Sequence, residues 1–113
     1  MNVILIPKTT GMFYPFLIFA RKAARPTKAL VTVNLERVID LIQKKVIKKV
    51  LIFSGAKSYV QGRIIWSYEV YNILRSLNKK IKIVLIDDKN WPVPDLIQIP
   101  DLNIVEKMKQ ALL

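Results

Sequence analysis

Short runs of Val, Ile, Leu and Phe alternate along the chain with longer amphipathic segments, and this alternation restricts the fold more than any other feature. Four runs are almost entirely apolar, at 2–6, 29–33, 49–53 and 81–86, and a weaker fifth lies at 96–99. Such runs are typical of parallel strands that are buried on both faces. The sequence therefore predicts an α/β fold: a three-layer Rossmann-like sandwich with a mainly parallel sheet of four or five strands.

The segments that separate these runs have the composition of helices. They lie at about 12–24, 35–46, 63–77 and 102–112. We expect Pro26 to end the first helix, Asn34 to cap the second and Asp101 to cap the last. The third segment has apolar or aromatic residues on nearly all sides, more than one sheet face can cover. We therefore expect this helix to form the contact of a homodimer.

The length of 113 residues suits one compact domain. We expect a single α/β domain over 1–113, in which 87–113 forms a Pro-containing loop and a C-terminal helix. One core of this size implies one principal site per chain.

The chain contains no Cys and no His, and this excludes whole classes of chemistry. The usual zinc ligands, thiolate nucleophiles and Ser-His-Asp constellations are missing. The sequence indicates no bound cofactor and no resident metal, names no reaction, and leaves enzymatic activity open. Ile and Lys are abundant, which fits a thermophile or an AT-rich genome equally well.

The amino-terminal region does not have the layout of a secretory signal. The longest apolar run near the start, 12–20, contains Pro15 and is well short of the roughly 20 residues that cross a bilayer. We therefore expect a cytoplasmic protein without a membrane span.

The net charge of +11 points to an anionic partner. The excess lies in the first 86 residues, because the segment from 87 onward is mildly acidic. The expected partners are a cyclic oligonucleotide, a nucleotide or nucleic acid, together with a second copy of the chain.

Two predicted loops after strands have the residue types that bind phosphate. In an open parallel sheet, ligands bind beyond the carboxyl ends of the strands, where helix amino termini favour anions. The first loop follows strand 2–6 and the second follows strand 49–53. Their candidate ligand-binding residues are Lys8, Thr9, Thr10 and Gly11 in the first, and Ser54, Gly55, Lys57, Ser58 and Arg63 in the second. Hydroxyls, cations and glycine-rich backbone together suit a phosphate group. A simple helix cap at the first loop and a solvated connection at the second remain open alternatives.

Both loops resemble those of CRISPR-associated Rossmann-fold (CARF) domains, which bind cyclic oligoadenylates. Thr9–Gly11 resembles the family's loop after strand one, and Phe53–Ser58 resembles its late strand end, with a matching order of elements over roughly 2–86. Ala56 departs from the family's second Gly, and 59–62 delays the helix. The resemblance implies a ligand site shared by two chains and a Ser/Lys pair able to position a ribose 2′-hydroxyl for cleavage of the ring. Its lining would be Thr10, Ser54, Gly55, Lys57 and Ser58.

Other features suggest different functions. Asp87, Asp88 and Lys89 have the acid-x-lysine spacing of restriction-type nucleases, in which carboxylates hold Mg²⁺, but the same residues often begin a loop. The lysines within 44–49 can grip a phosphate backbone or form a solvated helix end. The favoured reading is a basic module that binds a phosphate-bearing ligand. A general DNA- or RNA-binding protein, a Mg²⁺-dependent nuclease and a structural assembly protein are the alternatives.

Overall fold

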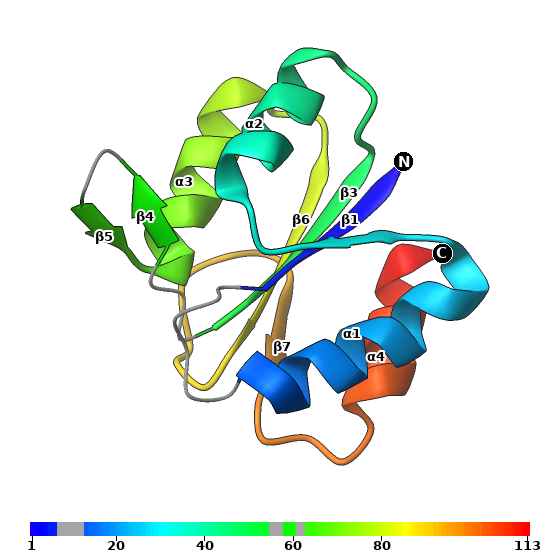
Figure 1. The fold of residues 1–113 in the computed structure, drawn as a ribbon. Coiled ribbons are helices and arrows are strands. Elements are labelled where there is room, and N and C mark those ends of the chain that lie inside the picture. The colour runs from blue at the N-terminus through cyan, green and yellow to red at the C-terminus, as the bar shows by residue number, and fades with distance from the viewer. Residues whose placement is uncertain (7–12, 55–57, 61–62) are drawn as a thin grey trace.

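Five parallel strands form the centre of the structure, in the order β2-β1-β3-β6-β7 (Figure 1). They are β1 (Asn2–Leu5), β2 (Leu30–Thr32), β3 (Lys49–Phe53), β6 (Lys82–Asp87) and β7 (Leu96–Gln98). This computed structural model describes residues 1–6, 13–54, 58–60 and 63–113. All four pairings within the sheet are parallel, which confirms the predicted α/β sandwich with its mainly parallel sheet.

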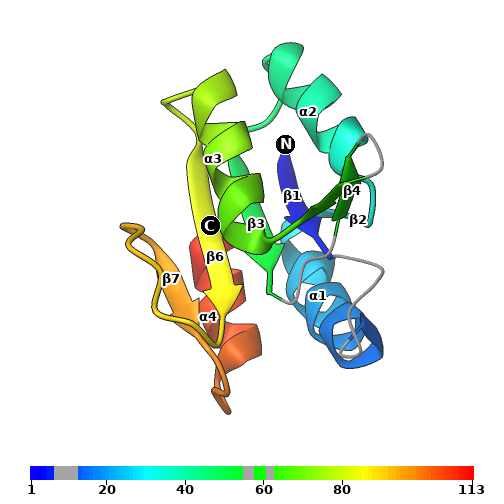
Figure 2. The same cartoon turned by 90° about the vertical axis from the view of Figure 1, so that its left-hand side faces the viewer.

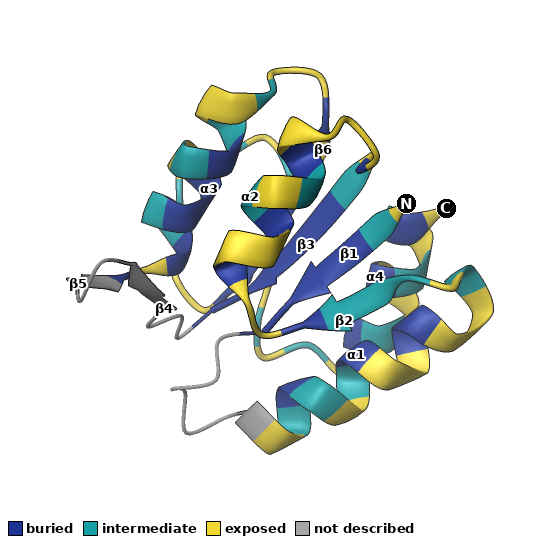
Figure 3. Cartoon of the chain, turned by 45° about the horizontal axis from the view of Figure 1, so that its top comes forward, coloured by how far each residue is buried: buried dark blue, intermediate teal, exposed yellow. Residues whose placement is uncertain are grey.

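Two pairs of helices cover the sheet, one pair on each face (Figures 1 and 2). On one face lie α2 (Leu35–Gln43) and α3 (Ser67–Leu77), and on the other lie α1 (Phe13–Thr27) and α4 (Ile104–Leu112). Alternate side chains of each strand point to opposite faces, so Val50 packs with the α2/α3 layer and Leu51 with the α1/α4 layer. In Figure 3 the central strands β1 and β3 are mostly buried and the edge strand β2 is mostly intermediate, whereas the outer sides of the helices are exposed.

The predicted helix over 63–77 begins later than expected. The described part of 58–65 forms an antiparallel hairpin of β4 (Ser58–Val60) and β5 (Arg63–Ile65), and α3 starts at Ser67. Ile65 is fully buried in the α2/α3 core. The predicted end at Leu77 is confirmed, but the predicted start was wrong. Apolar residues of β5 run directly into those of α3, so the pattern does not separate strand from helix. Fewer apolar residues therefore belong to α3 than the homodimer argument assumed.

Helix α1 continues past Pro26, which was expected to end it. Proline has no amide hydrogen, so one intrahelical hydrogen bond is missing in this last turn. The Thr27 hydroxyl donates to the Ala23 carbonyl at 3.1 Å and so supplies a partner for one of the last carbonyls. The helix ends where Lys28 adopts a left-handed conformation with φ of 55°.

Asn34 caps the amino terminus of α2, as predicted. Its side-chain oxygen accepts a hydrogen bond from the Arg37 amide at 3.2 Å. This satisfies one of the amide donors that the first turn leaves without an intrahelical partner.

The carboxyl end of α2 is a Schellman turn at Gln43, three residues before the predicted end. The Lys45 amide donates to the Ile42 carbonyl at 2.9 Å, and the Val46 amide donates to the Leu41 carbonyl at 3.3 Å. Lys45 takes the left-handed position of the turn, with φ of 60°, where glycine is the usual residue.

The left-handed conformation predicts a stabilising substitution. We expect Lys45→Gly to raise the free energy of unfolding by about 1 kcal/mol, because glycine adopts this conformation without steric cost. Urea unfolding followed by circular dichroism measures the change. Lys44→Gly is the matched control, because Lys44 has φ of −78°, and it should not stabilise the protein.

The segment 87–113 contains the predicted loop and helix, and the weaker fifth strand expected at 96–99 is β7. Strand β7 pairs with β6 at the sheet edge, and α4 packs beside α1. Helix α4 begins two residues after the predicted start, and its N-cap is Asn103 rather than Asp101. Asp101 instead accepts a hydrogen bond from the Asn103 amide at 2.8 Å in the preceding turn.

Candidate functional site

The two predicted ligand loops leave adjacent strands at the same edge of the sheet. Leu5 of β1 pairs with Ile52 of β3, so the carboxyl ends of the two strands lie side by side. After β1 the chain passes to α1 on one face, and after β3 it passes through the hairpin to α3 on the other (Figures 1 and 2). Because the two connections leave to opposite faces, the carboxyl ends of β1 and β3 form the topological switch point, where ligands of open α/β sheets bind.

The described residues contain only part of the predicted ligand site. Ser54 follows β3 directly and is buried, and its amide donates to the Ile86 carbonyl at 2.7 Å. Ser58 and Arg63 are the first residues of β4 and β5. The remaining predicted residues, Lys8, Thr9, Thr10, Gly11, Gly55 and Lys57, lie outside the described part of the chain. The structure therefore brings together the strand ends from which these loops depart.

A group of aromatic rings around one lysine lies at the neighbouring strand end, beyond β6. The Lys89 Nζ lies 5.9 Å from the ring centroid of Trp66 and 5.6 Å from that of Trp91. Tyr68 stacks on Trp91, with centroids 4.8 Å apart and planes nearly parallel. Trp66 remains 48% exposed. We call Trp66, Tyr68, Lys89 and Trp91 the aromatic platform; its distances to Lys89 are those of cation-π contacts.

The carboxylate of Asp87 holds the platform in place. Asp87 ends β6 and is only 3% exposed. One carboxylate oxygen accepts hydrogen bonds from the Ser67 hydroxyl at 2.6 Å and the Trp91 indole nitrogen at 2.8 Å. The other accepts from the Lys89 amide at 3.0 Å. Asp87 thus joins the start of α3 to the loop after β6.

The electrostatics of the two adjacent carboxyls differ. Burial has the largest influence on Asp87 and raises its pKa. The hydrogen bonds that it accepts, that from Ser67 first, together outweigh burial, so its pKa lies below the ordinary 3.8. The pKa of Asp88 is raised, chiefly through its hydrogen bond with Asp87. At neutral pH Asp87 is therefore a fixed negative charge.

This geometry gives little support to a magnesium site at Asp87, Asp88 and Lys89. Both oxygens of Asp87 already accept hydrogen bonds from protein donors, and Lys89 faces two indole rings. In the described ranges, no group of three or more acidic side chains is arranged to hold a metal ion. The carboxylate acts here as a structural hydrogen-bond acceptor.

Sequence patterns alone do not indicate how the platform is assembled. The contacts join residues at the start of α3 to residues of the loop after β6, which lie far apart in the sequence. A weak signal is Asp87 at a strand end, since buried carboxylates require donors. It does not identify which donors.

The comparisons with known proteins agree with the fold. No protein-family model matches the sequence, and no curated protein matches it. The structure itself, in its described residues, contains no helix that is long and apolar enough to span a membrane. Among solved structures, the chain is similar to a flavodoxin-like domain from Synechococcus sp, with 10% identity and a TM-score of 0.60. The match covers 99% of this chain and 93% of that domain. It shows a flavodoxin-like α/β fold.

Proposed function

We propose that this protein binds a phosphate-bearing ligand of the nucleotide class at the switch point between β1 and β3. The observation that supports this most directly is the adjacency of the two strand ends, because it starts both ligand loops from one place. In the flavodoxin-like strand order, this is the position at which nucleotide-like ligands bind. The net charge of +11 favours an anion.

The phosphate group is assigned to the residues of the two loops. Backbone amides at Gly11 and Gly55, hydroxyls of Thr10 and Ser58, and the Lys57 ammonium are the proposed partners. Lys8, Thr9, Ser54 and Arg63 complete the proposed set.

The base of the ligand is assigned to the aromatic platform. Ser54 is hydrogen-bonded to Ile86, the residue before Asp87, so the platform begins one strand away from the switch point. The exposed indole of Trp66 offers a flat surface for base stacking, which contributes about 1–3 kcal/mol per base. A mononucleotide and a cyclic oligoadenylate both fit this combination of phosphate loops and stacking surface.

Equilibrium titration followed by tryptophan fluorescence tests the proposal. The probes are AMP, flavin mononucleotide and cyclic tetra-adenylate, each added in the absence of Mg²⁺. We expect saturable quenching by at least one of them, because Trp66 is partly exposed. The stoichiometry distinguishes one ligand per chain from one ligand shared by two chains, as in the CARF-like reading.

Substitution of Lys57 tests the assignment of the phosphate. We expect Lys57→Ala to weaken binding of that probe at least about tenfold, through loss of a charge-assisted contact. Lys22→Ala, on the exposed side of α1, removes the same charge and should bind as the wild type does. Equal affinity of Lys57→Ala and wild type, or no quenching by any probe, would contradict the proposal.

A further inference from the structure

The amino-terminal ends of the strands lie opposite the switch point, and the surface around them is strongly basic. Here the amino ends of the strands meet the carboxyl ends of α2 and α3. The exposed lysines of this surface are Lys44, Lys45, Lys48, Lys79, Lys80 and Lys82. Of these, only Lys44 forms an ion pair within the described part of the chain, with Asp40 at 2.9 Å.

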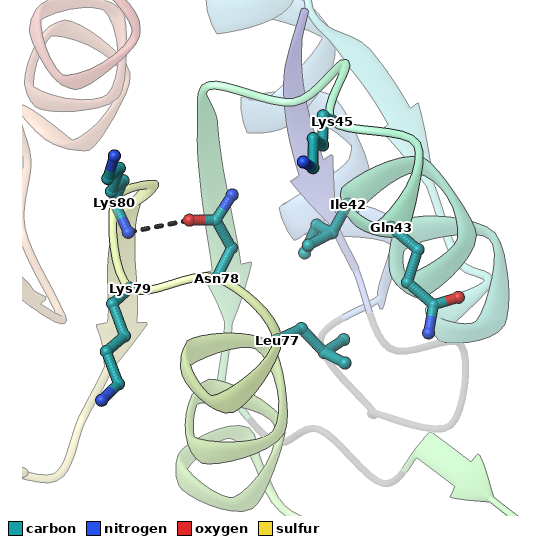
Figure 4. Close-up of a pocket in the computed structure, with 7 residues that line it drawn as sticks. All are labelled: Ile42, Gln43, Lys45, Leu77, Asn78, Lys79 and Lys80. Carbon is teal, nitrogen blue, oxygen red and sulfur yellow. Dashed lines mark hydrogen bonds between the residues drawn. The ribbon is translucent and has the colours of Figure 1, made fainter.

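A groove of about 710 Å³ lies between the ends of α2 and α3 (Figure 4). Figure 4 shows Ile42 and Leu77 between the two helix ends, with Lys45 on one side and Lys79 and Lys80 on the other. Gln43 and Asn78 add side-chain amides to the lining. The groove therefore combines an apolar floor with cations on both sides. We call it the basic groove.

Neutralising the dipole of α3 does not account for Lys79 and Lys80. A cation in the last turn stabilises a helix end, and Arg75 already does this for α3. Its guanidinium donates to the carbonyls of Lys79 and Ile81, at 3.1 and 2.6 Å. Lys79 and Lys80 lie beyond the helix end, and their ammonium groups are additional to this arrangement.

Lys45 occupies the left-handed position at the end of α2, where glycine would give the lower backbone energy. Its left-handed backbone conformation carries a steric cost, yet its side chain places an exposed charge at the groove. A residue that costs stability and supplies charge at the same place suggests that the charge has a use.

From this arrangement we propose that the basic groove binds the phosphate backbone of a nucleic acid. Phosphodiester groups repeat at short intervals along a strand, so they match lysines on both sides of a groove. A membrane surface is less well matched, because interfacial sites insert aromatic and large apolar side chains. The described lining of this groove is concave and contains no aromatic residue, and of its two large apolar side chains Ile42 is buried, which leaves only Leu77 accessible within that lining. Binding is expected to be independent of base sequence, because lysine contacts to phosphate carry no sequence information.

The test compares two triple variants that lose the same charge. The first is Lys45→Gln, Lys79→Gln, Lys80→Gln at the groove. The control is Lys22→Gln, Lys107→Gln, Lys109→Gln, on the helices that cover the other face of the sheet. Fluorescence anisotropy with labelled duplex and single-stranded DNA of mixed sequence gives the affinity at salt concentrations from about 50 mM to about 200 mM.

We expect wild-type protein to bind with an affinity that falls steeply with salt. The groove variant should bind at least about tenfold more weakly at low salt, and the slope of log K against log salt should become shallower by about 2 to 3. The control variant should remain within about threefold of wild type. Equal losses in both triple variants would overturn the proposal, because the binding would then depend on net charge alone.

Two further measurements keep the result from being explained by misfolding or by lipid binding. Lys45→Gly should be more stable than wild type and yet bind DNA more weakly, which a folding defect cannot produce. Vesicles of phosphatidylserine and phosphatidylcholine should not compete with DNA at equal phosphate. Binding to these vesicles that needs the groove lysines, without DNA binding, would overturn the assignment to nucleic acid.

Discussion

Replacing Phe53 by alanine is expected to lower the free energy of unfolding by about 4 kcal/mol. The side chain is fully buried at the end of β3, in the α1/α4 core. Its ring stacks on that of Phe16, with centroids 4.5 Å apart, so the substitution removes an aromatic contact and leaves a cavity. Urea unfolding measures the loss, which is a large part of the about 5–15 kcal/mol available to a domain.

Ile18→Ala is the matched control for this prediction. Ile18 lies on the same helix as Phe16, but it is 52% exposed and does not belong to either core cluster. Its substitution should change the free energy of unfolding by less than about 0.5 kcal/mol. A loss below about 2 kcal/mol for Phe53→Ala would mean that the α1/α4 core is not closed around this ring.

The sheet could be predicted because strands that are buried on both faces consist of almost uninterrupted apolar runs. Runs such as 49–53 are apolar at nearly every position, and only strands covered on both sides tolerate this. The cap at Asn34 was also predictable, since it depends on one side chain and an amide three residues away.

The hairpin of β4 and β5 could not be predicted, because its signal is short and ambiguous. Each strand has three residues, and Ile65 continues into the apolar pattern of α3. Period cannot separate a strand from a helix over so few positions. The continuation of α1 past Pro26 is accompanied by a hydroxyl-to-carbonyl hydrogen bond from Thr27 that a proline rule does not include.

The candidate site also has one part that could be predicted and one part that could not. The adjacency of the two ligand loops follows from strand order, and an alternating α/β pattern restricts that order to a few possibilities. The aromatic platform depends on contacts between side chains far apart in the sequence, such as Ser67 with Asp87. No local pattern indicates such pairs, and the left-handed conformations of Lys28 and Lys45 are equally invisible in a sequence without glycine there.

Replacing Asp87 by asparagine is expected to lower the free energy of unfolding at pH 7 by about 3 kcal/mol. The substitution replaces one carboxylate oxygen by an NH2 group, which cannot accept a hydrogen bond. At least one of the three donors, Ser67, Trp91 and the Lys89 amide, is then left without an acceptor. Trp91 should also become more mobile, with a red-shifted emission. Thermal unfolding and tryptophan fluorescence measure both effects.

Asp88→Asn is the control, because it removes the same charge from the next residue. Asp88 is exposed, and its ionised form is disfavoured by Asp87. Its substitution should therefore leave stability at pH 7 within about 0.5 kcal/mol of wild type or raise it slightly. Equal losses in the two variants would show that net charge matters rather than the hydrogen bonds of Asp87.

The pH dependence separates the two carboxyls further. The pKa of Asp87 is lowered in the folded state, so its contribution to stability is present above the unfolded value of 3.8 and disappears as pH falls through the folded value. The deficit of Asp87→Asn relative to wild type should therefore shrink as pH falls from about 7 to about 2. The pKa of Asp88 is raised, so its contribution has the opposite sign and is lost as pH rises through the folded value. The stability of Asp88→Asn relative to wild type should thus increase as pH rises. A stability deficit of Asp87→Asn that stays constant with pH would contradict the role of Asp87 as an ionised, hydrogen-bonded carboxylate.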